Sequence, residues 1–162
     1  MNADPTDSEL AAQEASLVYA SFTNDDAITL GLAVIEEARA RQLAITVDVR
    51  RGEQQVFHAA LQGTTADNDA WVERKVRVVR HFEESSYRVG CTLRRLGGTI
   101  DSIFLLDPTR YGAHGGAFPI RVRGAGVVGV VTVSGLPQRE DHELVVEVLS
   151  RLLKKQYVRL VP

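Results

Sequence analysis

The stretch that decides the fold is AFPIRVRGAGVVGVVTVSG, residues 117–135. Two runs rich in β-branched residues, 117–122 and 127–135, flank the segment RGAG, whose glycines are typical of a turn. This pattern predicts two antiparallel strands joined as a hairpin. GAGVVG, residues 124–129, also matches the G-x-G-x-x-G dinucleotide pattern, but that site needs a helix to begin at the glycines, and these run into a strand. We therefore expect a hairpin and no dinucleotide site here.

A second hairpin is predicted upstream, where LAITVDVRR (43–51) and QQVFHAAL (54–61) alternate like strands. Cap residues and helical spacing predict five helices: from Asp7 or Ser8 to about Ala15, from Thr23 or Asn24 onward, from about Asn68 to Glu84, over 86–97 ending at Gly97 and Gly98, and from near Pro137 onward. Gly31, inside the second helix, indicates close packing against another backbone. Residues 99–116 remain ambiguous. Hairpins without β-α-β alternation predict an α+β fold with an antiparallel sheet.

Composition narrows the classes of function. The chain has 162 residues, 44% hydrophobic and 25% charged, and a net charge of −2, so no basic field attracts nucleic acid or an anionic membrane. No apolar run approaches the ~20 residues that span a bilayer. Cys91 is the single cysteine, and the acidic start MNADPTDSELAAQEA is unlike a signal peptide. We expect a cytoplasmic protein with a flexible segment 1–7 and a single domain over 8–162, and with neither nucleic acid nor membrane as a partner.

The predicted helix NDAWVERKVRVVRHF, residues 68–82, carries a lysine in an unexpected place. Lys75 lies four residues after Trp71 and three before Val78, so it falls inside the apolar stripe. A lysine on an inward face must extend its ammonium to water, pair with an acid or meet an anionic ligand, and the sequence leaves these alternatives open. We expect His81 on the exposed helix face and His58 on a strand to be structural or solvated.

Two other histidines stand where a ligand could bind. His142 follows Asp141 in the opening turn of the last helix, where the dipole favours a carboxylate and a neutral imidazole. Such a ring could bind a ligand or simply pack at the helix start. His114 precedes Gly115 and Gly116, which either let backbone amides approach a ligand or only shape the loop. No Ser-His-Asp, Cys-His, H-E-x-x-H or phosphate-loop pattern occurs, so we assign neither a catalytic nucleophile nor a metal site.

Three segments occur together: DNDAWVERK (67–75), GAHGGAFP (112–119) and VSGLPQREDH (133–142). With their flanks, over roughly residues 17–157, they resemble the haem-degrading-domain superfamily, also called GlcG/HbpS-like, and within it a branch of uncharacterised proteins. The resemblance implies a profilin-like antiparallel sheet flanked by helices, and assembly as a homo-oligomer. Some relatives bind haem or a corrinoid-linked cofactor, so it implies haem as a candidate cofactor, but it assigns no histidine here as the axial ligand.

The motif positions and the residue analysis together give one predicted ligand-binding set: Asn68, Asp69, Trp71, Lys75, His114, Gly115, Gly116, Phe118, Pro119, Asp141 and His142. We expect these to converge on a partly apolar pocket, with Lys75 and His142 close together and accessible to solvent. The pocket would suit a small-molecule ligand that is anionic, such as a carboxylate, or haem-like. Without an evident nucleophile, we expect binding rather than turnover.

An alternative function is that of a structural or interaction protein, which would act through contacts between its own copies and with protein partners. An exposed edge strand AFPIRV (117–122) and the tail QYVRLVP (156–162) would supply its surfaces.

Overall fold

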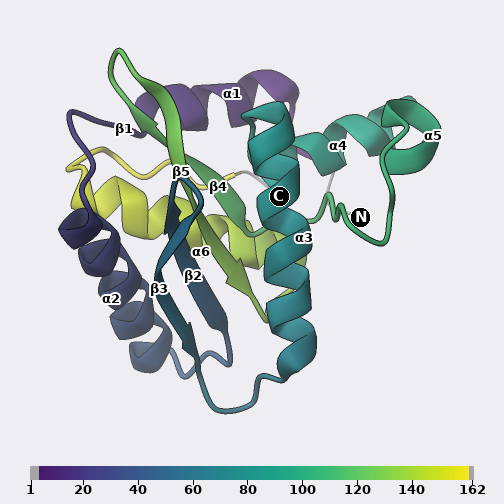
Figure 1. Cartoon of the computed structure of the whole chain (residues 1–162). Coiled ribbons are helices and arrows are strands. Elements are labelled where there is room, and N and C mark those ends of the chain that lie inside the picture. Colours follow the sequence, from purple (N-terminus) through teal and green to yellow (C-terminus); the bar gives the residue numbers. More distant parts are fainter. Residues whose placement is uncertain (1–3, 161–162) are drawn as a thin grey trace.

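The structure is a computed structural model that describes residues 4–160, in which six helices pack around one five-stranded sheet (Figure 1). The helices are α1 (Asp7–Ser16), α2 (Asn24–Ala40), α3 (Ala66–Phe82), α4 (Ser86–Leu96), α5 (Ile100–Phe104) and α6 (Gln138–Leu152). The strands are β1 (Val18–Tyr19), β2 (Thr46–Arg51), β3 (Gln54–Ala60), β4 (Ala117–Val122) and β5 (Gly126–Ser134). These elements confirm the predicted α+β class.

The four long strands confirm both predicted hairpins. β2 pairs with β3, and β4 pairs with β5, in antiparallel register. The hairpins join through β2 and β5, where Asp48 lies opposite Thr132, and the strand order is β1-β4-β5-β2-β3. The predicted antiparallel sheet is confirmed over these four strands, and the structure adds one short parallel pairing at its edge, where β1 runs alongside β4 with Val18 opposite Arg121. Two residues are too few for an alternating pattern, so periodicity could not reveal this strand.

Threonine caps set where the two longest helices, α2 and α3, begin. At α2, the Thr23 hydroxyl accepts a hydrogen bond from the amide of Asp26, whose carboxylate accepts one from the amide of Thr23. Thr65 and Asn68 form the same reciprocal capping box at α3, which therefore begins at Ala66 rather than at Asn68. The short helix α5 lies in the segment that the sequence left ambiguous.

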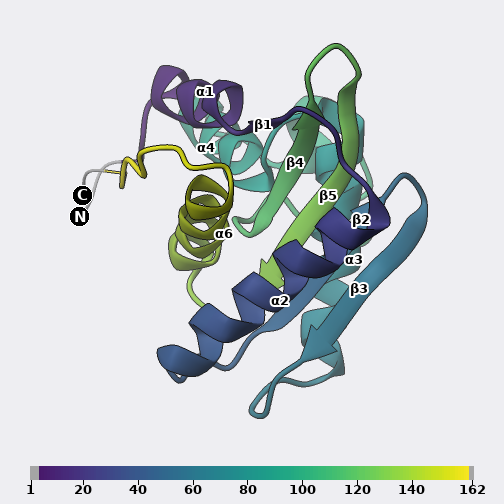
Figure 2. The ribbon, with the colours of Figure 1, turned by 90° about the vertical axis from the view of Figure 1, so that its left-hand side faces the viewer.

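Helices cover both faces of the sheet, with α2 and α6 on one face and α3 on the other (Figure 2). The main core lies between the sheet and α2 with α6, and its members include Leu30, Val34, Val47, Val49, Phe118, Val131, Val133, Leu144 and Val145. A Cβ on Gly31 would lie 2.2 Å from the ring of Phe57. Close packing at Gly31 is therefore confirmed, but its neighbour is an aromatic side chain and not another backbone.

The prediction that AFPIRV is an exposed edge strand is wrong. Residues 117–120 of β4 are buried. The amide of Ala117 donates a hydrogen bond to Ser86 Oγ at 3.0 Å, and its carbonyl accepts one from the same hydroxyl at 3.3 Å. Part of this strand edge is thus satisfied by α4 and is not open to another chain.

Both ends of the described chain pack against helices. Asp4 pairs with Arg94 of α4, and Asp7 already belongs to α1. In the predicted contact tail, the amide of Leu160 donates to Glu143 of α6 at 2.9 Å. Residues 1–3 of the predicted flexible segment and residues 161–162 of the tail lie outside the described residues.

Candidate functional site

A cavity of about 250 Å³ opens beside α3, between its first half, the loop before β4 and the turn from β5 to α6. We call it the α3 pocket. Its lining residues are Asp67, Asn68, Trp71, Lys75, His114, Ser134, Gly135, Leu136, Gln138 and Asp141. The fold thus brings five of the predicted ligand-binding residues together at one cavity: Asn68, Trp71, Lys75, His114 and Asp141.

Lys75 supplies the ammonium group of this pocket, although its side chain is only 4% exposed. Its Nζ donates hydrogen bonds to the carbonyl of Val133 at 3.0 Å and to Asp141 Oδ2 at 3.1 Å. Of the fates that the sequence left open, pairing with an acid is therefore the one observed. An ammonium has three N–H donors, so one remains after these two bonds.

Asp141 is as deeply buried as its partner, with 2% of its side chain exposed. Its second oxygen, Oδ1, accepts a hydrogen bond from the amide of Leu136 at 3.0 Å. Burial raises the pKa of Asp141 to about 6, against the opposing effect of Lys75. Burial also lowers the pKa of Lys75, against the opposing effect of Asp141. Because desolvation works against both charged forms, this ion pair contributes little to the stability of the fold.

Three polar side chains of the pocket, Asn68, Gln138 and Ser134, accept hydrogen bonds from the fold itself. Asn68 Oδ1 accepts from the amide of Thr65 at 3.0 Å, and Gln138 Oε1 accepts from the amide of Gly115 at 3.3 Å. Ser134 Oγ accepts a long bond of 3.5 Å from Asn68 Nδ2. The amide nitrogen of Gln138 and the hydroxyl proton of Ser134 have no partner among the described residues, so the pocket is lined mainly by donors.

One side of the pocket is aromatic. The rings of Trp71 and His114 meet edge to face, with centroids 4.8 Å apart, and the Arg74 guanidinium lies 4.1 Å from the indole centroid. His114 is exposed at the mouth, but partial desolvation of its ring lowers its pKa, and Lys75 adds to this effect. The ring is therefore neutral at pH 7.

Gly115 and Gly116 allow the loop before β4 to approach α6 and β5 closely. A Cβ on Gly115 would lie 2.0 Å from the carbonyl oxygen of Gln138. A Cβ on Gly116 would lie 2.2 Å from the carbonyl oxygen of Val133 and 2.7 Å from Lys75 Nζ, and Gly116 has a φ of +130°. The glycines thus shape the wall around Lys75 by close packing.

Four residues of the predicted set lie away from the pocket lining. Phe118 belongs to the main core, and Pro119 is buried next to it in β4. Asp69 faces the other side of α3, where its Oδ1 is 3.0 Å from His58 Nε2 but makes no aligned hydrogen bond. The fourth is His142.

His142 is 1% exposed, so the predicted solvent access beside Lys75 is wrong. Its Nε2 lies 2.9 Å from Gln13 Oε1 of α1, and its ring packs against Tyr87 and Phe118. Burial lowers the pKa of His142 to about 3. The predicted neutral imidazole is confirmed, with burial as the main cause.

Ser134 and Gln138 are pocket residues that the predicted set left out. Both belong to the VSGLPQ segment, which was the available signal. Their role as donors depends on which of their polar atoms stay without a partner once the chain has folded. The sequence alone does not show this.

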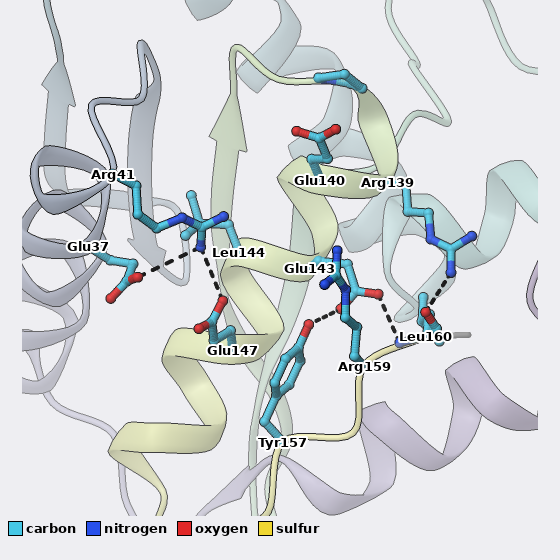
Figure 3. Close-up of a pocket in the computed structure, with 11 residues that line it drawn as sticks. Glu37, Arg41, Arg139, Glu140, Glu143, Leu144, Glu147, Tyr157, Arg159 and Leu160 are labelled. Atoms are coloured by element: carbon cyan, nitrogen blue, oxygen red, sulfur yellow. Dashed lines mark hydrogen bonds and ion pairs between the residues drawn. The ribbon is translucent and has the colours of Figure 1, made fainter. Parts of the chain in front are cut away.

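A larger groove of about 740 Å³ lies along the outer side of α6 (Figure 3). Arg41, which follows α2 directly, pairs with Glu37 and reaches across to Glu147 at 3.2 Å. Glu143 accepts a hydrogen bond from the Tyr157 hydroxyl. Many of the charged side chains in this groove thus pair with one another. The hydrogen bond between Tyr157 and Glu143 holds the C-terminal segment against α6.

A third hollow, of about 290 Å³, lies under the opposite side of α3 and is also charged. Arg50 Nε donates to Asp48 Oδ1 at 2.8 Å, and Arg50 also pairs with Glu73. His58 Nδ1 lies 3.5 Å from Asp48 Oδ2. No group of three or more His, Cys, Asp or Glu residues within 4–160 is arranged to hold a metal ion.

None of the helices in the described part of the chain is long and apolar enough to cross a membrane. A family model described as haem degrading protein HbpS-like matches residues 22–150. The chain is 56% identical over 153 residues to a UPF0303 protein of Streptomyces avermitilis, which covers 94% of both chains.

Solved structures share the fold. The crystal structure of Ybr137w protein has a TM-score of 0.86 at 28% identity, covering 92% of this chain and 88% of that one. A structure of a PduOC–heme complex has a TM-score of 0.65 at 14% identity, covering 82% and 94%. These matches confirm the resemblance and the fold that it implied. The chain belongs to the HbpS-like family of haem-degrading proteins, and its relatives include UPF0303 proteins.

Proposed function

We propose that this protein binds a small carboxylate in the α3 pocket. The observation that carries the proposal is the set of free donors: the third N–H of Lys75, the side-chain amide nitrogen of Gln138 and the hydroxyl of Ser134. Donors that outnumber acceptors match a ligand that brings its own acceptors, and a carboxylate brings two oxygens. Two acceptors remain, the Asp67 carboxylate and one nitrogen of the neutral His114 ring, and both residues are exposed. Asp67 lies 4.0 Å from Arg74.

The size of the cavity limits the ligand. Pockets that enclose drug-sized ligands measure roughly 300–1,000 Å³, whereas this one measures about 250 Å³. A carboxylate of a few heavy atoms therefore fits, whereas haem would lie mostly outside it. The likeness to the PduOC–heme complex, at 14% identity, shows a shared fold and carries no argument for a shared ligand.

Titration with lactate, monitored by amide NMR shifts, tests the proposal. We expect saturable shifts in the loop 112–116 and the turn 134–138. Lys75→Met should abolish them, and Lys155→Met, a matched change at an exposed lysine, should not. Shifts that are absent in the wild type, or equal in Lys75→Met, would contradict carboxylate binding at this pocket.

A second function, assembly with further copies of the chain, rests on a different observation. Leu96, Ile103 and Leu105 are 58%, 39% and 88% exposed at the corner formed by α4 and α5, and α5 projects from the body (Figure 1). We propose that this corner is a contact between copies. Light scattering after size exclusion tests it, because Leu105→Asp should reduce the assembled mass, and a monomeric wild type would rule the contact out.

A further inference from the structure

Lys75, the buried basic residue of the α3 pocket, is one of only three lysines in the chain, in which arginine is much more frequent. Lys154 and Lys155 are exposed after α6, whereas Lys75 is buried. A guanidinium keeps its proton at any physiological pH, but an amine can lose it when desolvated and then acts as a nucleophile. The residue type at this position thus permits chemistry that arginine would not.

The two hydrogen bonds of Lys75 also fix the direction of its lone pair. A neutral amine has two N–H groups and one lone pair. With the N–H groups directed at Val133 O and Asp141 Oδ2, at 3.0 and 3.1 Å, the lone pair occupies the remaining tetrahedral position. A Cβ at position 116 would lie 2.7 Å from Lys75 Nζ. Because residue 116 is glycine, no side chain crowds the nitrogen from this direction.

We propose that Lys75 is a nucleophilic amine that forms an imine with a small 2-oxo acid held in the α3 pocket. This inference rests on the proposed function, because Gln138 and Ser134, two of its three free donors, still hold the carboxylate. Gln138 and Ser134 supply neutral donors for the carboxylate oxygens, which leaves the adjacent keto carbon to face Lys75. A 2-oxo acid places these two groups on neighbouring carbons, so a cavity of about 250 Å³ accommodates both.

Asp141 is placed to move the protons of this reaction. The Lys75 nitrogen attacks the keto carbon, a C–N bond forms, and the carbonyl π pair goes to oxygen, which takes a proton from nitrogen to give a carbinolamine. The protonated carboxyl of Asp141 then gives its proton to the hydroxyl, the C–O bond breaks and water leaves. The nitrogen lone pair completes the C=N bond, and the resulting iminium N–H faces the Asp141 carboxylate.

The electrostatics of the pair favour this sequence. Burial lowers the pKa of Lys75, which increases the fraction of neutral amine at neutral pH. Burial raises the pKa of Asp141 to about 6, which keeps its proton available closer to neutrality than an ordinary aspartic acid would.

Reduction with borohydride tests the proposal, because it converts an imine into a stable secondary amine. The full chain is incubated with pyruvate, reduced, and analysed by intact mass and peptide mapping. We expect one reduced pyruvyl group per chain, on the peptide that contains Lys75. Lys75→Arg should lose the adduct and Lys155→Arg should keep it. If Lys75→Arg fails to fold, peptide mapping of the wild type still locates the adduct.

Lactate separates this inference from the proposed function, because it carries the carboxylate but no carbonyl. If lactate and pyruvate bind alike and no adduct forms, the imine is refuted and carboxylate binding stands. If neither binds and no adduct forms, both proposals fail. Equal modification of Lys154 and Lys155 would also overturn the assignment, since it would indicate surface chemistry.

Discussion

The sheet face under α2 and α6 is apolar, whereas the face under α3 carries buried polar and charged side chains. Along β2, Val47 and Val49 point into the main core, and Asp48 and Arg50 point toward α3. Lys75 and Asp141 extend the polar character of the α3 side. Burial of aliphatic groups stabilises the fold, but burial of charges opposes it. Stability therefore explains the side chains of the first face, and the proposed ligand site would give a reason for the Lys75–Asp141 pair of the second.

The largest effect is expected on the apolar face. Phe118→Ala should lower the free energy of unfolding by about 3–5 kcal/mol, because a fully buried ring leaves a cavity. Urea denaturation followed by circular dichroism measures this loss. Lactate binding by the remaining folded protein should be unchanged, since Phe118 does not line the α3 pocket. A loss of less than about 1 kcal/mol would show that this face is not the stabilising one.

On the α3 side, the ion pair provides the next largest effect. Lys75→Met should cost about 3 kcal/mol, because it leaves the Asp141 carboxylate buried without its cation. Adding Asp141→Asn keeps an oxygen for the amide of Leu136 and removes the unpaired charge. The double variant should recover most of the loss in urea denaturation at pH 7. A double variant that loses the sum of both single changes would mean that the pair stabilises the fold after all.

The sequence predicted most of the helices and strands. Of the ion pair, it predicted the inward position of Lys75 but not its pairing with Asp141. The spacing of Trp71, Lys75 and Val78 predicted the inward position of the lysine. Its partner Asp141 lies 66 residues away, and pairing over that distance depends on how α6 docks on the sheet. The predicted set also included His142, from its place in the opening turn of the last helix and in the VSGLPQREDH motif. Neighbours on a helix point in different directions, however, and the structure turns this ring toward Gln13.

The smallest effects on stability are expected at Thr132 and Val133, neighbours on β5 whose side chains point to opposite faces of the sheet. Thr132 has a buried hydroxyl without a partner in the described part of the chain, so Thr132→Val should stabilise the protein by up to about 1 kcal/mol. Val133→Thr buries a new hydroxyl in the main core and should cost about 1–3 kcal/mol. Thermal unfolding at one pH measures both. Changes of the same sign would contradict the distinction between the faces.

The central claim, a carboxylate site governed by Lys75 and Asp141, is tested most directly by calorimetric titration with lactate at pH 5 and pH 8. The pKa of Asp141 is raised to about 6, so at pH 5 Asp141 is mostly neutral and no longer competes for the ammonium of Lys75. Lactate stays ionised at both values, because ordinary carboxyl pKa values lie near about 4. We predict tighter binding at pH 5, by at most about tenfold per pH unit below the pKa, the limit for one linked proton. Asp141→Asn should remove this pH dependence. Equal affinity at both pH values, or the same pH dependence in Asp141→Asn, would contradict the account.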